Sequence, residues 1–178
     1  ALSDDTMRIK DCNNDLFSEI EKTLKTETII SNFIDIELRE GQITVLVKDK
    51  KNSKIIKNIL SDFLYNRFKF KIQILESSHS IDIISAETSK NLIIDYCRKK
   101  LGNEANTTKF LCIGDRGKYP GNDYQLLSNE YSLSVDQVSN DPYSCWNLAS
   151  TGNNCVEATL EYFDAISPTG KKTFKIKL

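Results

Sequence analysis

The sequence predicts an α/β fold in two parts, an α+β unit over residues 13–85 and an α/β layer over residues 86–178, after a lead-in of residues 1–12. Two observations carry this prediction. Before Ser85, helical stripes and period-two strands follow one another in the order α-β-β-α-β-β. After Ser85, one short uninterrupted apolar run, residues 110–113, lies between helical segments, which is typical of a buried parallel strand.

The first unit is expected to be an open antiparallel sheet with two helices on one face. Leu16, Ile20 and Leu24 recur at helical spacing after Asn13 or Asn14 as a cap, and a second apolar stripe covers residues 55–64. Strands are expected over residues 34–38, 43–47, 68–74 and 81–84, because apolar and polar residues alternate there. This order gives a four-stranded sheet whose second face is left open.

The second unit is expected to begin with a helix that Thr88 or Ser89 caps and Gly102 ends. Its predicted buried stripe comprises Leu92, Ile93, Tyr96, Cys97 and Leu101. The remaining predicted elements are the strand at 110–113, a short helix at 124–128, a strand at 131–135, a helix at 156–166 and a terminal edge strand at 173–178. The long loop at 136–154 follows the second of these strands, and a loop of that length is often functional.

Two carboxylates follow the apolar run of the second unit. Gly114 allows a sharp turn before Asp115, and Asp123 lies at the start of the next predicted helix. Ligands of α/β sheets bind beyond the carboxyl ends of the strands, so this pair is a candidate metal or phosphate site. The alternative is structural, with Asp115 opening a turn and Asp123 capping a helix.

Composition narrows the class of protein. The formal net charge is -1, from 24 basic and 25 acidic side chains, so no global field attracts nucleic acid or an anionic membrane. The five cysteines include no C-x-x-C pair, which favours a reduced, cytoplasmic compartment and excludes a zinc site of thiolates. No apolar run is long enough to span a membrane, and residues 1–10 lack the apolar core of a secretory signal.

Several short motifs together resemble the haloacid dehalogenase superfamily of phosphatases. They are Ser89-Lys90 opening a helix, Gly114-Asp115 and Asn122-Asp123 one helix and strand later, and Asn153 to Val156 before the last helix. Within that superfamily, the motifs more closely resemble the branch with an α/β cap, which includes sucrose-phosphate and trehalose-phosphate phosphatases. The resemblance implies that residues 13–85 are the cap and residues 86–178 the C-terminal half of a Rossmann-like core.

The resemblance also implies the chemistry. Lys90 would contact the phosphate and the nucleophile, and Asp115 and Asp123 would hold Mg²⁺, so that two cations offset the repulsion between a phosphoryl group and a carboxylate. A sugar phosphate is the expected substrate class. Candidate substrate contacts are Asn122, Arg116, Glu37, Arg39 and His79. For Arg116 the alternative is a solvent-facing loop, and for His79 a surface turn.

The sequence departs from the family in two ways. Residues 116–120 lengthen the acidic motif, which leaves open which aspartate coordinates metal directly. No two of the fourteen aspartates are two positions apart, so the Asp-x-Asp motif that supplies the nucleophile is not in this chain. We therefore expect part of a phosphatase, inactive by itself, that lacks the first half of its core. The alternatives are a non-catalytic binding or interaction module, or a second chain that supplies the missing strands, and self-association is expected of an incomplete core.

Overall fold

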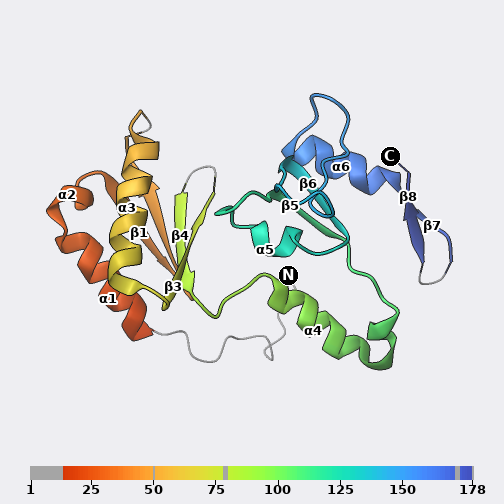
Figure 1. Ribbon diagram of the computed structural model, residues 1–178, viewed down its shortest axis with the longest axis horizontal. Coiled ribbons are helices and arrows are strands. Elements are labelled where there is room, and N and C mark those ends of the chain that lie inside the picture. Colours follow the sequence, from red (N-terminus) through yellow and green to blue (C-terminus); the bar gives the residue numbers. More distant parts are fainter. Residues whose placement is uncertain (1–13, 50, 78–79, 171–172, 178) are drawn as a thin grey trace. The chain divides into compact units, whose positions relative to one another are not determined.

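The computed structural model describes residues 14–49, 51–77, 80–170 and 173–177. The chain divides into two compact units, residues 1–88 and residues 89–178, which we call the first and second unit (Figure 1). Each unit combines helices with a β-sheet. In the described residues, no helix has the length and apolar character that a membrane span requires.

The first unit contains the four-stranded antiparallel sheet that the sequence predicts, and the structure gives its strand order as β1-β2-β4-β3. Its elements are α1 (Asn14–Thr26), α2 (Thr28–Ser31), β1 (Ile34–Arg39), β2 (Gln42–Val47), α3 (Ser53–Phe68), β3 (Ile72–Glu76) and β4 (Ser80–Ser85). The hairpin β1–β2 turns at Glu40 and Gly41, and Gly41 has a φ of 72°, which a residue without a Cβ adopts at no steric cost. Local turn chemistry therefore sets the register of this hairpin.

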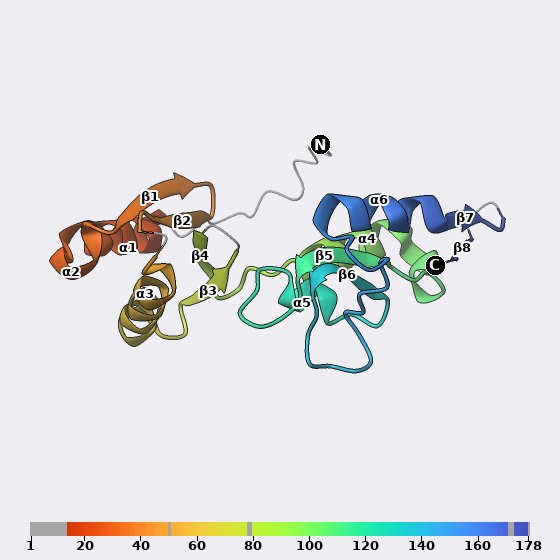
Figure 2. The same cartoon turned by 90° about the horizontal axis from the view of Figure 1, so that it is seen from above.

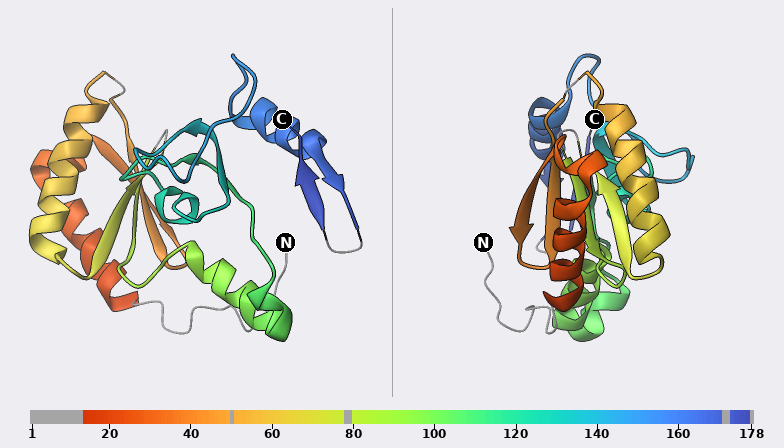
Figure 3. Two further views of the ribbon diagram at one scale, coloured as in Figure 1. Left: turned by 45° about the vertical axis from the view of Figure 1, so that its right-hand side comes forward. Right: turned by 90° about the vertical axis from the view of Figure 1, so that its left-hand side faces the viewer.

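Helices α1 and α3 cover the same face of that sheet (Figure 3). Ile20 and Leu24 of α1 and Leu60 and Leu64 of α3 are fully buried against strand residues such as Ile83. Because side chains alternate along a strand, the residues between the buried ones lie on the opposite face. That face carries the polar side chains of β1, β2 and β4, as the alternation in the sequence predicts.

Two details of the first unit differ from the sequence-based expectation. The strand predicted from residue 68 begins at Ile72, because α3 continues to Phe68, whose side chain is buried in the helix–sheet core. Phe70 lies in the turn between them with a φ of 67° and an exposed ring. On α3, Ile55 and Ile59 are exposed, and the buried stripe is Ile56, Leu60, Leu64 and Phe68. These buried residues are four positions apart, so they lie along a narrower part of the helix surface than the predicted stripe, which also included Ile55 and Ile59.

The second unit is built around two parallel strands, β5 and β6. Its elements are α4 (Asn91–Leu101), the 3₁₀ helix η2 (Gly102–Asn106), β5 (Cys112–Arg116), α5 (Tyr124–Leu127), β6 (Ser132–Gln137), α6 (Cys155–Ala165), β7 (Ile166–Pro168) and β8 (Phe174–Ile176). The C-terminal strand does not join β5 and β6 as an edge. It pairs with β7 in a separate antiparallel hairpin.

Helices lie on both sides of β5 and β6 (Figure 2). On one side, Cys112 of β5 packs with Ile94 of α4 and Leu127 of α5. On the other, Leu133 of β6 packs with Ala158 and Tyr162 of α6. Helices therefore cover both faces of these parallel strands, which is usual for parallel sheets. The strand predicted at residues 110–113 begins instead at Cys112 and continues to Arg116, and of its residues only Cys112 is fully buried.

The buried stripe of α4 agrees with the predicted one only in part. Leu92 and Ile93 are about half exposed, whereas Ile94 is buried and Cys97 and Leu101 are partly buried. These three residues have i, i+3, i+7 spacing, so they share one face of the helix. Compared with the prediction, α4 is rotated about its axis so that Ile94 faces the core, where it packs with Cys112, Leu127 and Cys145.

Two neighbouring isoleucines of α3 test the assignment of its buried face. Replacing buried Ile56 by alanine (Ile56→Ala) is expected to lower the free energy of unfolding by about 2–5 kcal/mol, because the packing and the burial are both lost. Ile55→Ala removes the same atoms from an exposed position and should change it by less than about 0.5 kcal/mol. Urea unfolding followed by circular dichroism measures both, and equal losses would contradict this orientation of the helix.

Candidate functional site

The candidate site lies where β5 ends and the chain turns into α5. Asp115 is the second-last residue of β5, and Asp123 directly precedes α5. The register between β5 and β6 shifts between the pairs Gly114–Ser134 and Arg116–Gln137. Such irregularities re-aim side chains and are frequent beside active sites. Here the irregularity falls at Asp115, the residue that the sequence singles out.

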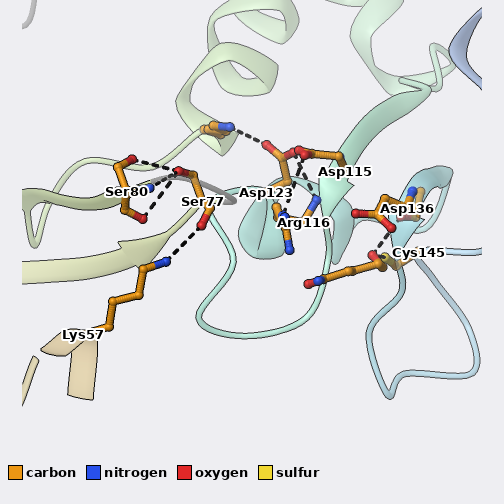
Figure 4. Close-up of polar contacts among 11 residues, drawn as sticks. Lys57, Ser77, Ser80, Asp115, Arg116, Asp123, Asp136 and Cys145 are labelled. Atoms are coloured by element: carbon orange, nitrogen blue, oxygen red, sulfur yellow. Dashed lines mark hydrogen bonds and ion pairs between the residues drawn. The ribbon is translucent and has the colours of Figure 1, made fainter. Parts of the chain in front are cut away.

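Asp123 is the anchor of the site. Its side chain is buried, and its Oδ2 accepts hydrogen bonds from the backbone N–H of Asp115 at 2.9 Å and of Arg116 at 3.5 Å (Figure 4). Its Oδ1 accepts a hydrogen bond from Nζ of Lys90, the residue that precedes α4. A single carboxylate thus ties the start of α4 to the end of β5.

The two carboxyl groups have opposite shifts in pKa. Burial raises the pKa of Asp115, and the neighbouring Asp123 carboxylate raises it further. Burial also acts to raise the pKa of Asp123, but the hydrogen bonds from Lys90 and from the Asp115 backbone outweigh it and the pKa is lowered. The negative charge of the pair therefore resides first on Asp123. A cation placed beside Asp115 would favour its ionised form.

Arg116 lies against this pair and is not solvent-facing. Its side chain is 18% exposed, and its Nε lies 3.8 Å from Oδ2 of Asp115. That Nε has no hydrogen-bond partner in the described part of the chain. Lys118, in the same loop, is exposed. Arg116 is therefore positioned as a donor beside the acidic pair, with capacity for one further acceptor.

The chain can pass so close to Asp123 only because Gly114 has no side chain. A Cβ at this position would lie 2.6 Å from Oδ2 of Asp123 and 2.7 Å from its Cγ. Gly121 is equally constrained, since a Cβ there would lie 2.4 Å from the backbone oxygen of Arg116. These glycines allow the loop to fold back so that Asp123 meets the backbone of the strand.

Asn122 precedes Asp123 and is partly buried. Its Oδ1 is buried and has no hydrogen-bond partner among the described residues. An unpaired buried oxygen is costly, so each one requires an explanation. A metal ion or a donor group on a ligand would provide the missing partner.

The other predicted substrate contacts belong to the first unit. Glu37 and Arg39 lie on the polar face of β1, and Nη2 of Arg39 donates to Oε2 of Glu37 at 2.7 Å. Both side chains are about half exposed. His79 lies outside the described residues. The second unit therefore brings together Lys90, Asp115, Arg116 and Asp123, while Glu37 and Arg39 form a pair of their own.

The sequence analysis missed the part that the 136–154 loop plays in supporting this site. The backbone N–H of Gly117 donates to the carbonyl of Gln137 at 3.0 Å. A Cβ on Gly117 would lie 2.1 Å from Sγ of Cys145, so the two loops are in direct contact. Cys145 is buried. No motif signals this contact, because it joins residues far apart in the sequence.

The carboxylates of the site do not by themselves make a complete metal cage. Within residues 14–49, 51–77, 80–170 and 173–177, no group of three or more histidine, cysteine, aspartate or glutamate side chains is arranged to hold a metal ion. Mg²⁺ is usually bound by one or two carboxylates together with waters and substrate phosphates. The arrangement fits that kind of site better than a cage made only of protein groups.

Comparison with known proteins gives a distant likeness in structure alone. No protein-family model matches the chain, and no curated protein matches its sequence. Two crystal forms of Aspergillus fumigatus trehalose-6-phosphate phosphatase are similar to it, with 14% and 13% sequence identity and TM-scores of 0.46 and 0.44. The alignments cover 80% and 82% of this chain but only 56% and 55% of those structures. The chain thus spans little more than half the length of these proteins, and a likeness at this level assigns neither family nor activity.

The hydrogen bonds of Asp123 predict a pH-dependent contribution to stability. Asp123→Asn should lower the free energy of unfolding at pH 7 by about 1–3 kcal/mol, because the charge-assisted bonds are lost. The pKa of Asp123 is lowered in the folded protein, so its contribution is present above the ordinary aspartate pKa of about 4 and is lost as the pH falls through the lower folded value.

Urea unfolding at a series of pH values measures this effect. The difference in the free energy of unfolding between wild type and Asp123→Asn should become smaller toward low pH. Asp95→Asn is the matched control, because Asp95 is exposed and, among the described residues, pairs with Arg98 at 3.3 Å. Its replacement should lower the free energy of unfolding by less than about 1 kcal/mol at any pH. A difference for Asp123→Asn that stays constant across the series would contradict the assigned charge state.

Proposed function

We propose that this chain is part of a Mg²⁺-dependent phosphohydrolase of the haloacid dehalogenase type that acts on a phosphate monoester, with a sugar phosphate as the substrate class. The observation that carries the proposal is the contact of an ammonium group, Lys90, with a buried carboxylate, Asp123, which in turn bonds the backbone of a second acidic residue, Asp115. These residues come from three separate segments of the chain. They are the residues that the family resemblance selects.

Lys90 suits phosphate binding in this position. Its side chain is 47% exposed although its Nζ bonds the buried Asp123. An ammonium group has three donors, so Lys90 can bind a phosphate oxygen while Asp123 still orients it. Its positive charge would offset the repulsion between a phosphate and a carboxylate nucleophile.

The donor set fits Mg²⁺ with Asp115 as the direct carboxylate ligand. Both oxygens of Asp123 already accept hydrogen bonds, whereas the Asp115 side chain is 42% exposed. Burial and the neighbouring Asp123 raise the pKa of Asp115, and a bound cation would offset both effects. The unpartnered Oδ1 of Asn122 is a further oxygen of the type that Mg²⁺ prefers. When bound, the ion would neutralise charge on the transferring phosphoryl group. Asp123 would act by positioning Lys90 and the Asp115 backbone.

The nucleophile of the proposed reaction lies outside this chain. A carboxylate oxygen would attack phosphorus, the ester oxygen would leave as an alcohol after protonation, and water would then hydrolyse the aspartyl-phosphate intermediate. The chain has no Asp-x-Asp motif to supply that carboxylate. An upstream segment or a second chain is therefore part of the proposal.

The outer surface of α6 supports the proposal that more of a core packs here. Val156, Leu160 and Phe163 are exposed by 66%, 56% and 57%, and their i, i+4, i+7 spacing places them on one face. Ala158 and Tyr162 bury the other face of the same helix. A helix that is apolar on two sides is usually buried on both. The missing core half, or a second copy of this chain, would cover this face.

Glu37 and Arg39 are proposed to contact the sugar. Their face of the sheet also carries Thr44 and Asp82, and Oγ1 of Thr44 donates to Oδ1 of Asp82 at 3.1 Å. Hydroxyl, carboxylate and guanidinium groups together can both donate and accept hydrogen bonds, as sugar hydroxyls require. His79 is kept as a proposed contact from the sequence alone.

Asp115→Asn is expected to weaken Mg²⁺ binding by roughly tenfold or more, because a carboxylate ligand becomes a neutral amide. Isothermal titration of the full chain with magnesium chloride measures the affinity. Asp164→Asn, at an exposed position of α6, is the matched control and should leave the affinity unchanged. Unchanged affinity in Asp115→Asn would remove Asp115 from the proposed metal site.

Phosphate release from a panel of sugar phosphates with Mg²⁺ tests the activity. The 178-residue chain is expected to be inactive, and a version extended upstream through its own reading frame is expected to be active. In the active form, Lys90→Ala should reduce turnover by roughly 10²-fold or more, whereas Lys99→Ala, at an exposed position of α4, should not. Inactivity of both forms with ligand binding retained would favour a non-catalytic module.

A further inference from the structure

The second unit contains a cavity that the proposed chemistry does not use. It has a volume of about 290 Å³ and lies between the 118–124 segment and the 139–144 loop. Small-molecule pockets start at roughly this size, which suits a single ring rather than an extended ligand. Its lining combines tyrosine rings with hydroxyl, amide and charged groups.

Two tyrosines form the aromatic wall. The rings of Tyr119 and Tyr124 meet edge to face, with centroids 5.5 Å apart and planes at 77°. Such edge-to-face contacts are favourable, so each ring stabilises this orientation of the other. Tyr119 is nevertheless 69% exposed. The exposed part of this ring presents an apolar surface to a ligand.

The opposite wall is a pre-organised polar loop. Oδ1 of Asp141 accepts a hydrogen bond from the backbone N–H of Tyr143 at 2.9 Å, and its Oδ2 accepts one from Oγ of buried Ser144 at 3.0 Å. The backbone N–H of Asp141 donates to Oγ of Ser139 at 3.2 Å. The carboxylate therefore has a fixed direction, and each of its oxygens keeps further acceptor capacity.

The charge of the lining favours a neutral ligand. Lys118 and Asp141 contribute one positive and one negative group, and the rest of the lining is uncharged. Asn140 and the serine hydroxyls both donate and accept hydrogen bonds. A ligand that suits this lining has an apolar face for the ring of Tyr119 and several hydroxyls for the loop.

From these features we infer that the cavity binds a neutral pyranose ring. The axial C–H bonds of a pyranose carry a small positive charge and would lie on the negative face of the Tyr119 ring. Its hydroxyls would bond Asp141 and Asn140. The cavity and the acidic site share one loop, since Lys118 and Tyr119 lie between Asp115 and Asp123 in the sequence. The inference does not depend on phosphatase activity, because it concerns an unphosphorylated sugar.

Amide chemical shifts of the ¹⁵N-labelled 178-residue chain, titrated with glucose and with maltose, test the inference. We expect the shifts to concentrate in residues 118–124 and 139–144. Tyr119→Ala should weaken binding by roughly three- to tenfold, and Tyr119→Phe should retain it, because the ring and not the hydroxyl makes the contact. Asn140→Ala, at an exposed position, tests the polar wall independently and should also weaken binding.

Tyr131→Ala is the control, since Tyr131 is also partly exposed in the second unit but does not line the cavity. It should leave binding unchanged. The inference is overturned if neither sugar shifts these amides, or if the shifts persist unchanged in Tyr119→Ala and Asn140→Ala. It is also overturned if inorganic phosphate, used as a comparison ligand, shifts them while both sugars do not.

Discussion

The candidate acidic site depends on one buried carboxylate, Asp123, whose two oxygens both accept hydrogen bonds. Asp123 receives Lys90 from the start of α4 and the backbone N–H groups of Asp115 and Arg116 from the end of β5. Removing a carboxylate from water is costly unless such donors replace the water. The same bonds that stabilise the charge therefore fix three segments of the chain, and every group of the candidate acidic site is positioned relative to Asp123.

Small residues make this arrangement possible. Gly114 admits the Asp123 carboxylate where any Cβ would collide with it, and Gly117 admits the sulfur of Cys145. The first contact shapes the acidic site, and the second holds the 136–154 loop beside it. One turn of the chain thus has the carboxylates at its ends and the cavity-lining residues Lys118 and Tyr119 at its centre. The same loop therefore belongs both to the proposed reaction centre and to the proposed sugar site.

The first unit has a different physical basis. Its sheet is stabilised by the apolar face that α1 and α3 cover, and the opposite face is free to carry polar groups that packing does not require. Thr44 and Asp82 on that face are hydrogen-bonded to each other, and Glu37 and Arg39 are paired. A sheet whose polar side chains already bond one another is suited to recognition, since fewer of them have to be oriented when a ligand binds.

The sequence by itself determined the antiparallel sheet with its two covering helices, because period-two and period-3.6 patterns are local, although the alternation at residues 68–71 did not mark a strand. It also selected Lys90, Asp115 and Asp123 through short motifs. Only the tertiary structure decided that Ile94 and not Ile93 is buried, that Arg116 turns inward, and that the C-terminal strand pairs with β7. These outcomes depend on which partner a side chain or strand meets, and such partners are distant in the sequence. The contact of Gly117 with Cys145 and the cavity beside it have the same origin, so no local pattern could have shown them.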